Sequence, residues 1–307
     1  MSAAAILSEP LAGLQAQALG LAEAAGLQPV VHALRPRAPW RWIAARAWPA
    51  PLRAVRLPPL GEGVVIGAGG VAARVAASLR RPGRPAVQVQ HPRMDPARFD
   101  LIVVNRHDDL TGPNVIVTRT ALHRATPARL AQARAEWEPR LAHLPRPLVA
   151  VLVGGSNGRY QLDAAVAEAL GAGLAQMMRD DRVGLALTPS RRTSPEALAA
   201  LHAALDPLGA WIWDGDGENP YFGLLALADA IVVTEDSVSM VSEACATSAP
   251  VLLARLPGRS RRIALFNRLL AQDGRVRDFQ GRLEMWPTAP LDDTPEAGAA
   301  LRRLLGL

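Results

Sequence analysis

Short apolar runs alternate with longer segments of helical periodicity along the whole chain. Eleven runs predict β-strands at residues 3–7, 29–34, 63–67, 86–90, 101–105, 114–118, 148–153, 183–187, 210–213, 230–234 and 251–254. Many are continuously apolar, as expected of strands buried on both faces of a parallel sheet. Helical patterns cover 14–25, 71–80, 126–141, 164–179, 195–205, 238–247 and 292–305. This alternation predicts an α/β fold with two Rossmann-like, doubly wound parallel-sheet domains.

The chain is expected to divide near residues 143–147. Pro145 and Pro147 end one helical pattern there, just before the next predicted strand. A length of 307 residues also suits two domains. We therefore expect an N-terminal domain at 1–144 and a C-terminal domain at 145–291, facing each other across a cleft. The last helix, within 292–307, is expected to return to the N-terminal domain.

The composition excludes several kinds of chemistry. All 34 basic residues are arginines, which rules out a lysine Schiff base, a P-loop lysine and the Tyr-x-x-x-Lys pair of a nicotinamide-dependent epimerase or reductase. The single cysteine, Cys245, excludes disulfides and cysteine-based metal clusters. The six histidines are scattered, so no metal site is predicted.

The net charge of +6 favours an anionic ligand or an anionic membrane surface. Aromatic residues make up only 4% of the chain, so no nucleic-acid partner is expected. The first ten residues lack the basic and apolar regions of a signal peptide, and no apolar run reaches 18 residues. We expect a cytoplasmic protein, with peripheral contact to the inner membrane as a further expectation.

The strongest candidate site is the glycine-rich segment that follows the predicted strand 148–153. Glycines let backbone N–H groups approach an anion, and the start of the following helix favours negative charge. An ordinary tight turn is the alternative. The segment also fits the G-x-S-x-G of a nucleophile elbow, but only His202 follows, inside a predicted helix, so a phosphate loop is preferred. The candidate residues are Gly154, Gly155, Ser156, Asn157, Gly158 and Arg159.

Two more candidate segments follow strands of the second domain. Adjacent arginines after the strand 183–187 suit phosphate oxygens, although a solvated arginine pair is equally plausible. Hydroxyls and carboxylates follow the strand 230–234, where a helix cap and a surface glutamate are the alternatives. The candidates are Ser190, Arg191, Arg192 and Thr193, then Asn219, Tyr221 and Phe222, then Glu235, Asp236, Ser237, Ser239, Met240 and Glu243.

The first domain carries a G-x-G-x-x-A match that includes Gly67, Gly69 and Gly70. The acidic residue expected about 20 positions later in a dinucleotide site is missing, so an anion or acceptor loop is preferred to NAD. His91 and His107 are acceptor-side candidates, with structural or surface roles as the alternative.

The segment from Arg35 to Leu60 holds three tryptophans and six arginines. Tryptophan and arginine together are typical of a membrane interface. A packed, irregular connection is the alternative.

The sequence resembles the bacterial branch of the mitochondrial fission (elongated mitochondria) protein family. The resemblance covers nearly the whole chain and is carried by residues 106–115, 118–124, 154–155, 190–193, 219–222 and 234–243. Its implied architecture is that of GT-B glycosyltransferases. Residues 232–252 are similar to the donor half of the lipid-linked N-acetylglucosamine transferase of peptidoglycan synthesis. By that resemblance Glu243 would hold the nucleotide ribose, residues 154–158 would lie near the diphosphate, and residues 67–70 would form an acceptor-side loop.

The expected function is therefore that of a GT-B-like protein that binds a nucleotide sugar, with a UDP-sugar as the first candidate. It would be a metal-independent glycosyltransferase with no bound cofactor, acting on a cell-envelope or lipid-linked acceptor. No catalytic base is evident. The rival expectation is a non-catalytic adaptor that keeps the fold and binds a protein partner.

Overall fold

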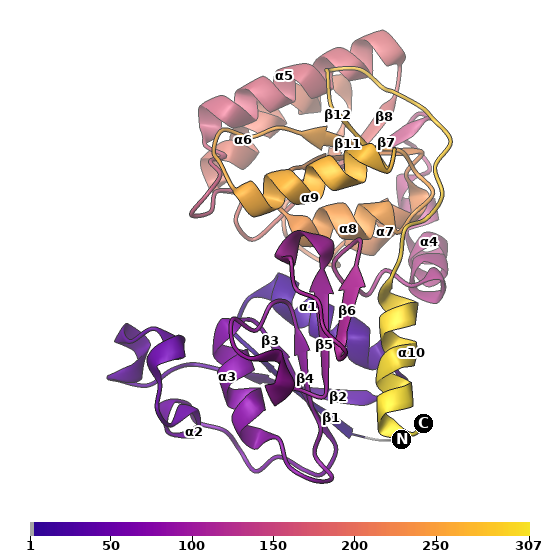
Figure 1. Cartoon of the computed structure of the whole chain (residues 1–307). Helices are drawn as coiled ribbons and strands as arrows, with labels where there is room; N and C mark the ends of the chain where they lie inside the picture. The colour runs from indigo at the N-terminus through magenta and orange to yellow at the C-terminus, as the bar shows by residue number, and fades with distance from the viewer. Residues whose placement is uncertain (1–2) are drawn as a thin grey trace. The chain divides into compact units, whose positions relative to one another are not determined.

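The structure, a computed structural model, describes residues 3–307 and contains two compact units (Figure 1). Unit 1 comprises the described residues up to Arg124 together with Asp292–Leu307, and unit 2 is Ala125–Leu291. Each unit is built on one six-stranded sheet in which all strands are parallel. All eleven predicted strands are present, so the predicted fold class is confirmed.

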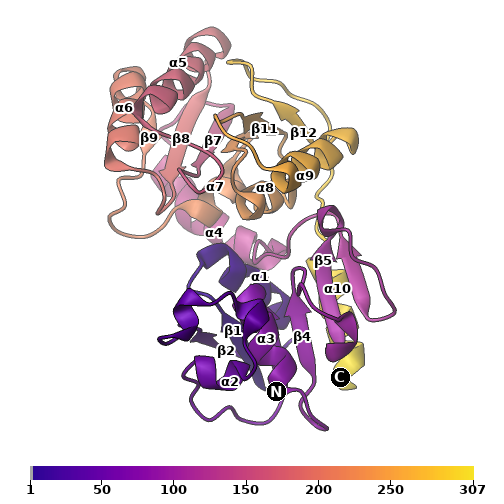
Figure 2. The same cartoon turned by 60° about the vertical axis from the view of Figure 1, so that its left-hand side comes forward.

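Unit 1 orders its strands β2-β1-β3-β4-β5-β6. Helices α1 and α10 cover one face of this sheet, and α2 and α3 cover the other (Figure 2). The strands are β1 (Ala3–Ser8), β2 (Gln28–Ala33), β3 (Val64–Ala68), β4 (Ala86–Val89), β5 (Leu101–Asn105) and β6 (Val115–Thr118), and the helices are α1 (Ala12–Ala24), α2 (Pro51–Ala54), α3 (Gly70–Leu79) and α10 (Thr294–Leu305).

Unit 2 orders its strands β12-β11-β10-β7-β8-β9. Helices α4, α7, α8 and α9 cover one face, and α5 and α6 cover the other. The strands are β7 (Leu148–Val153), β8 (Gly184–Pro189), β9 (Trp211–Ile212), β10 (Ala230–Thr234), β11 (Val251–Ala254) and β12 (Val276–Asp278), and the helices are α4 (Pro127–Leu141), α5 (Ala164–Asp181), α6 (Pro195–Leu205), α7 (Tyr221–Leu227), α8 (Val238–Cys245) and α9 (Arg261–Gln272).

The units divide between Arg124 and Ala125, about 20 residues before the predicted division at residue 144. The difference comes from α4, which packs against α7 of unit 2. Gly223 allows this approach, because a Cβ added there would lie 2.3 Å from the Trp137 side chain. The two prolines at 145 and 147 therefore precede β7 inside unit 2 rather than separating the units.

The C-terminal segment belongs to unit 1 and packs against α1. A Cβ at Gly298 would lie 2.6 Å from the Cβ of Ala24. The side chain of Arg119 donates to the Asp293 carboxylate at 3.0 Å, and buried His123 pairs with Asp292 at 3.2 Å. Among residues 3–307, no helix is long and apolar enough to span a bilayer.

The strand orders place one topological switch point in each sheet. In unit 1 the chain passes from β1 outward to β2 and then returns to β3 on the other side of β1. In unit 2 it passes from β7 to β9 and then returns to β10 beside β7. Ligands of open α/β sheets bind beyond the carboxyl ends of the strands at such points. The loops after β1, β3, β7 and β10 are therefore the places where the fold favours a ligand.

Candidate functional site

Three of the predicted segments meet at the carboxyl edge of the unit 2 sheet. The segments after β7, β8 and β10 are direct neighbours because β7 lies between β10 and β8. The Gly154 amide donates to the Thr234 hydroxyl at 2.7 Å, and the Ser190 hydroxyl donates to the Gly154 carbonyl at 2.6 Å. The segments that sequence reasoning grouped as one site thus form a single hydrogen-bonded cluster at the switch point.

Gly154 and Gly155 serve the packing of this cluster. A Cβ on Gly154 would lie 2.2 Å from the Asp236 carboxylate, and a Cβ on Gly155 would lie 2.1 Å from the Arg192 carbonyl oxygen. The Gly155 amide points to the Asp236 carboxylate at 3.4 Å. The sequence predicted that these glycines let backbone N–H groups approach an anion. In the structure the two positions are glycine because neighbouring protein segments approach them.

The central charges of the cluster are Arg192 and Asp236. The guanidinium lies 2.7 Å from the Asp236 carboxylate and donates to the Gly155 carbonyl at 2.9 Å. The Asp236 side chain is 0% exposed, and among residues 3–307 its Oδ1 has no hydrogen-bond partner. Since a buried carboxylate already neutralises Arg192, the predicted arginine pair leaves Arg191 as the exposed free charge.

The segment after β7 is a structured loop of ten residues, 154–163, and not a tight turn. The Leu162 amide donates to the Ser156 hydroxyl at 2.9 Å, and the Asn157 side chain accepts from the Arg159 amide at 2.8 Å. Asp163 caps α5 by accepting from the Val166 amide. The helix start that was expected to favour an anion is thus capped by a carboxylate of the chain, and anion binding by this loop stays a prediction. A nucleophilic role for Ser156 has no geometric support either, since its hydroxyl accepts a backbone hydrogen bond.

Glu243 and Tyr221 form the second part of the site. Glu243 lies buried in α8, and the Tyr221 hydroxyl, at the start of α7, donates to its Oε2 at 2.5 Å. Burial, followed by the charge of Glu243, raises the pKa of Tyr221 well above its usual value. The phenol therefore stays protonated and holds the carboxylate in place. Sequence reasoning named both residues but gave no signal of their contact, because α7 was not predicted as a helix.

The remaining predicted residues of unit 2 have local roles. Ser237 caps α8 by accepting from the Met240 amide at 3.4 Å, and Asn219 accepts from the Tyr221 amide at 2.9 Å. Ser239 and Met240 are partly exposed on α8, and Phe222 lies under the Arg129 guanidinium. The Ser190 amide donates to the Thr193 hydroxyl at 3.0 Å, which closes the loop after β8.

Glu235 links the ends of two neighbouring strands. Its carboxylate accepts from Arg255 at 2.7 Å and from the Leu256 amide at 3.1 Å, so it ties the end of β10 to the end of β11. The prediction that Glu235 contacts the nucleotide has no support in this geometry.

At the switch point of unit 1 the glycine loop approaches Glu9, which the sequence analysis did not single out. A Cβ on Gly69, whose φ is +94°, would lie 2.7 Å from the Glu9 carboxylate. Gly67 makes room for the buried Gln88 in the same way, and Gly70 opens α3. Burial raises the pKa of the half-buried Glu9. A carboxyl group thus lies against the glycine loop that was predicted to serve the acceptor, where no acid was predicted.

The two histidines that were predicted for the acceptor side have local partners. His91 accepts from the Arg93 amide at 2.9 Å, and the mostly buried His107 lies 3.8 Å from the Asp108 carboxylate. Asp214 accepts from the Asp216 amide at 3.0 Å in an exposed turn. Within residues 3–307, no three His, Cys, Asp or Glu side chains are grouped closely enough to hold a metal ion.

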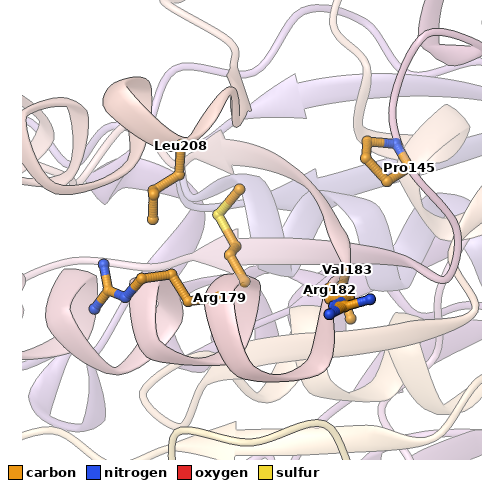
Figure 3. A pocket seen from close by; sticks show the side chains of 6 residues that line it. Pro145, Arg179, Arg182, Val183 and Leu208 are labelled. Atoms are coloured by element: carbon orange, nitrogen blue, oxygen red, sulfur yellow. The ribbon is translucent and has the colours of Figure 1, made fainter.

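One cavity in unit 2 lies away from these loops. It measures about 360 Å³ and is lined by Pro145, Met178, Arg179, Arg182, Val183 and Leu208. Pro145 and Val183 precede β7 and β8, so the cavity lies at the amino edge of the sheet. Figure 3 shows that the Arg179 and Arg182 side chains do not converge on a common point. The cavity therefore lacks the built polar site that a nucleotide requires.

Comparison with known proteins identifies the family. The profile described as Mitochondrial fission ELM1 matches residues 12–305, and the chain belongs to this family. The protein named Mitochondrial fission protein ELM1 from Arabidopsis thaliana is 34% identical over 284 residues, which cover 80% of this chain. The match covers 64% of that relative, so the chain spans less than two thirds of its length.

Solved structures match the whole chain at low sequence identity. MurG of Acinetobacter baumannii aligns with a TM-score of 0.51 and 17% identity, covering 100% of this chain and 92% of MurG. UDP-GlcNAc 2-epimerase of Neisseria meningitidis, solved with UDP-GlcNAc bound, aligns with a TM-score of 0.54 and 10% identity, covering 100% of both chains. These matches confirm the expected GT-B-like fold. At such identities they carry the fold alone.

Proposed function

We propose that this member of the mitochondrial fission ELM1 family binds a nucleoside-diphosphate sugar at the carboxyl edge of the unit 2 sheet. The observation that carries the proposal is the Glu243 carboxylate, which Tyr221 holds at 2.5 Å beside the loops of the switch point. A carboxylate can accept hydrogen bonds from both hydroxyls of a ribose. A fixed side chain loses less conformational entropy on binding than a mobile one. Glu243 is therefore the proposed ribose contact.

The diphosphate is proposed to lie at the loops after β7 and β8. Arg191 and Arg159 are exposed there and provide positive charge, whereas Arg192 is neutralised by Asp236 and orders the loops. Arginine forks suit phosphate oxygens, so these side chains replace the electrostatic task of a metal ion. The solved epimerase with bound UDP-GlcNAc supports UDP-sugars as the first ligands to test.

As an extension of this proposal, the protein transfers the sugar to an acceptor hydroxyl. Such a transfer needs a proton acceptor on the acceptor side. Glu9 is the proposed group, because it is a half-buried carboxylate at the unit 1 switch point and burial raises its pKa. We infer that a Glu9→Gln substitution leaves nucleotide binding unchanged and lowers the rate of nucleotide release from a donor sugar at least 10-fold.

A second candidate function is a non-catalytic adaptor that retained the fold. The observation that favours it is that groups of the cluster already bond to each other and to their neighbours. The Gly154 amide, the Gly155 carbonyl and Arg192 all have partners within the protein. An adaptor of this kind would bind no nucleotide and would act through its surface.

Thermal unfolding with a ligand panel separates the two functions. The panel contains UDP-GlcNAc, UDP-glucose, GDP-mannose, CMP-sialic acid, dTDP-glucose and the free nucleotides. A ligand at 100 times its Kd adds about 2.7 kcal/mol to stability. The proposed function predicts a raised Tm with one nucleotide class and its loss in Glu243→Ala, but not in the exposed control Glu168→Ala. An unchanged Tm with every ligand at millimolar concentration supports the adaptor instead.

A further inference from the structure

An exposed apolar surface lies on an arginine-rich segment of unit 1, in the part of the chain between β2 and β3. It consists of two single helical turns, Trp40–Trp42 and Ala45–Ala47, followed by α2 (Figure 1). We define the Trp42 surface as the exposed side chains of Trp42, Ile43 and Leu52, which are 69%, 41% and 43% exposed. It lies outside the proposed nucleotide site, which belongs to unit 2.

Two of the three tryptophans in this segment anchor it to the unit 1 core. Trp48 is 5% exposed, donates to the Ile43 carbonyl at 3.0 Å and packs with α3 residues. Trp40 contacts Trp48 edge to face at 6.4 Å between ring centroids. The sequence analysis treated the tryptophans as one group. The structure assigns a core role to Trp40 and Trp48 and leaves Trp42 facing solvent.

The segment that bears the Trp42 surface carries positive charge only. Residues 24–61 contain no Asp or Glu, whereas six arginines lie within residues 35–56: Arg35, Arg37, Arg41, Arg46, Arg53 and Arg56, all of them exposed. The Arg41 guanidinium lies 4.4 Å from the centre of the Trp42 ring. Arg37 links the start of this segment to α2, because its amide donates to the Ala54 carbonyl at 2.9 Å and its side chain donates to the Arg53 carbonyl.

We propose that the Trp42 surface binds the surface of an anionic lipid bilayer. Indole rings prefer the level of the lipid headgroups, where an apolar body and a polar N–H are both satisfied. The arginines complement anionic headgroups, and their aliphatic stems can lie along the inserted apolar side chains. A small acidic patch on a folded protein partner would pair with only some of the six arginines, which are spread over residues 35–56.

Co-sedimentation with vesicles of phosphatidylcholine alone and with 30% phosphatidylglycerol tests this inference on the full chain. The wild type should pellet with the anionic vesicles at low salt and stay in the supernatant with the neutral ones. Trp42→Ala should raise the half-saturating lipid concentration at least 5-fold. Met285→Ala, which removes a side chain that is 56% exposed in unit 2, should leave it unchanged. Bromolipid quenching of tryptophan fluorescence should disappear in Trp42→Ala.

A second variant, Arg41→Gln/Arg46→Gln/Arg53→Gln, should lose binding at low salt while its circular dichroism and Tm stay at wild-type values. Three results would overturn the inference. The wild type could remain in the supernatant with anionic vesicles, Trp42→Ala and Met285→Ala could weaken binding equally, or heparin could bind the protein while Trp42→Ala has no effect on vesicles. The last result would identify a general polyanion site.

Discussion

The Tyr221 hydroxyl donates a 2.5 Å hydrogen bond to the Glu243 carboxylate, joining the first residue of α7 to the second turn of α8. Both helices pack on the same face of the unit 2 sheet, beside β10 and β7. The contact holds a buried carboxylate in one orientation next to the switch point. The proposed nucleotide site depends on this arrangement more than on the glycine loop.

Removing the donor of this contact should cost stability and affinity together. Tyr221→Phe leaves the buried Glu243 carboxylate with one hydrogen bond fewer, which costs about 1–3 kcal/mol. Chemical denaturation of both proteins measures the difference. In Glu243→Gln the same Tyr221→Phe change should cost less, because a hydrogen bond to a neutral amide is weaker than one to a carboxylate. Equal costs in the two backgrounds would show that the strength of the hydrogen bond does not depend on the negative charge of Glu243.

Arg192 and Arg191 should behave differently although they are adjacent. Arg192→Ala leaves the fully buried Asp236 carboxylate without its partner, so we expect a loss of about 3 kcal/mol of folding free energy. Arg191→Ala removes an exposed side chain and should change stability by less than about 0.5 kcal/mol. Calorimetry should instead show weaker diphosphate binding in Arg191→Ala. A stable Arg192→Ala variant would contradict the structural role of the ion pair.

The glycines of the loop after β7 should also separate into two groups. Gly154→Ala places a Cβ 2.2 Å from Asp236, whereas Gly158→Ala meets no atom within 4 Å. We therefore expect Gly154→Ala to lose about 1–3 kcal/mol through overpacking and Gly158→Ala to fold normally. Denaturation midpoints of the two variants check this. Equal tolerance at both positions would show that the cluster is loosely packed.

Glu9 should make stability depend on pH. Burial raises its pKa in the folded state above the ordinary value of 4.5, so its penalty is absent below that pH and grows as the pH rises through the folded pKa. Glu9→Gln removes the penalty. Its Tm should exceed that of the wild type at pH 7, and the difference should vanish near pH 4. If the Tm difference between Glu9→Gln and the wild type were the same at both pH values, it would not come from the ionisation of Glu9.

The sequence predicted the strands well because buried parallel strands are short, continuous apolar runs. It missed β12, whose residues Val276, Arg277 and Asp278 include only one apolar side chain, and it missed α7 and α9. The candidate segments were predicted because parallel strands bring their carboxyl ends to one edge. Their contacts could not be predicted. Arg192–Asp236 and Tyr221–Glu243 join residues 44 and 22 positions apart in the chain, and no local periodicity encodes such pairs.

Divalent cations should not be required for nucleotide binding. The proposed site neutralises phosphate with arginine, and Asp214 and Asp216 form an exposed turn of their own. Titration of the nucleotide in EDTA and in magnesium should give Kd values that agree within about 3-fold, a difference well under 1.4 kcal/mol. Binding that appears only with magnesium would assign Asp214 and Asp216 to the site instead.

Isothermal titration of UDP and UDP-GlcNAc into the wild type, Glu243→Ala and Glu168→Ala tests the central claim most directly. The account predicts binding to the wild type and to the exposed control. It predicts a loss of at least 10-fold in affinity in Glu243→Ala, which corresponds to about 1.4 kcal/mol or more. Circular dichroism establishes that the three proteins are equally folded. Nucleotide affinity that is the same in Glu243→Ala and in the wild type would contradict the account.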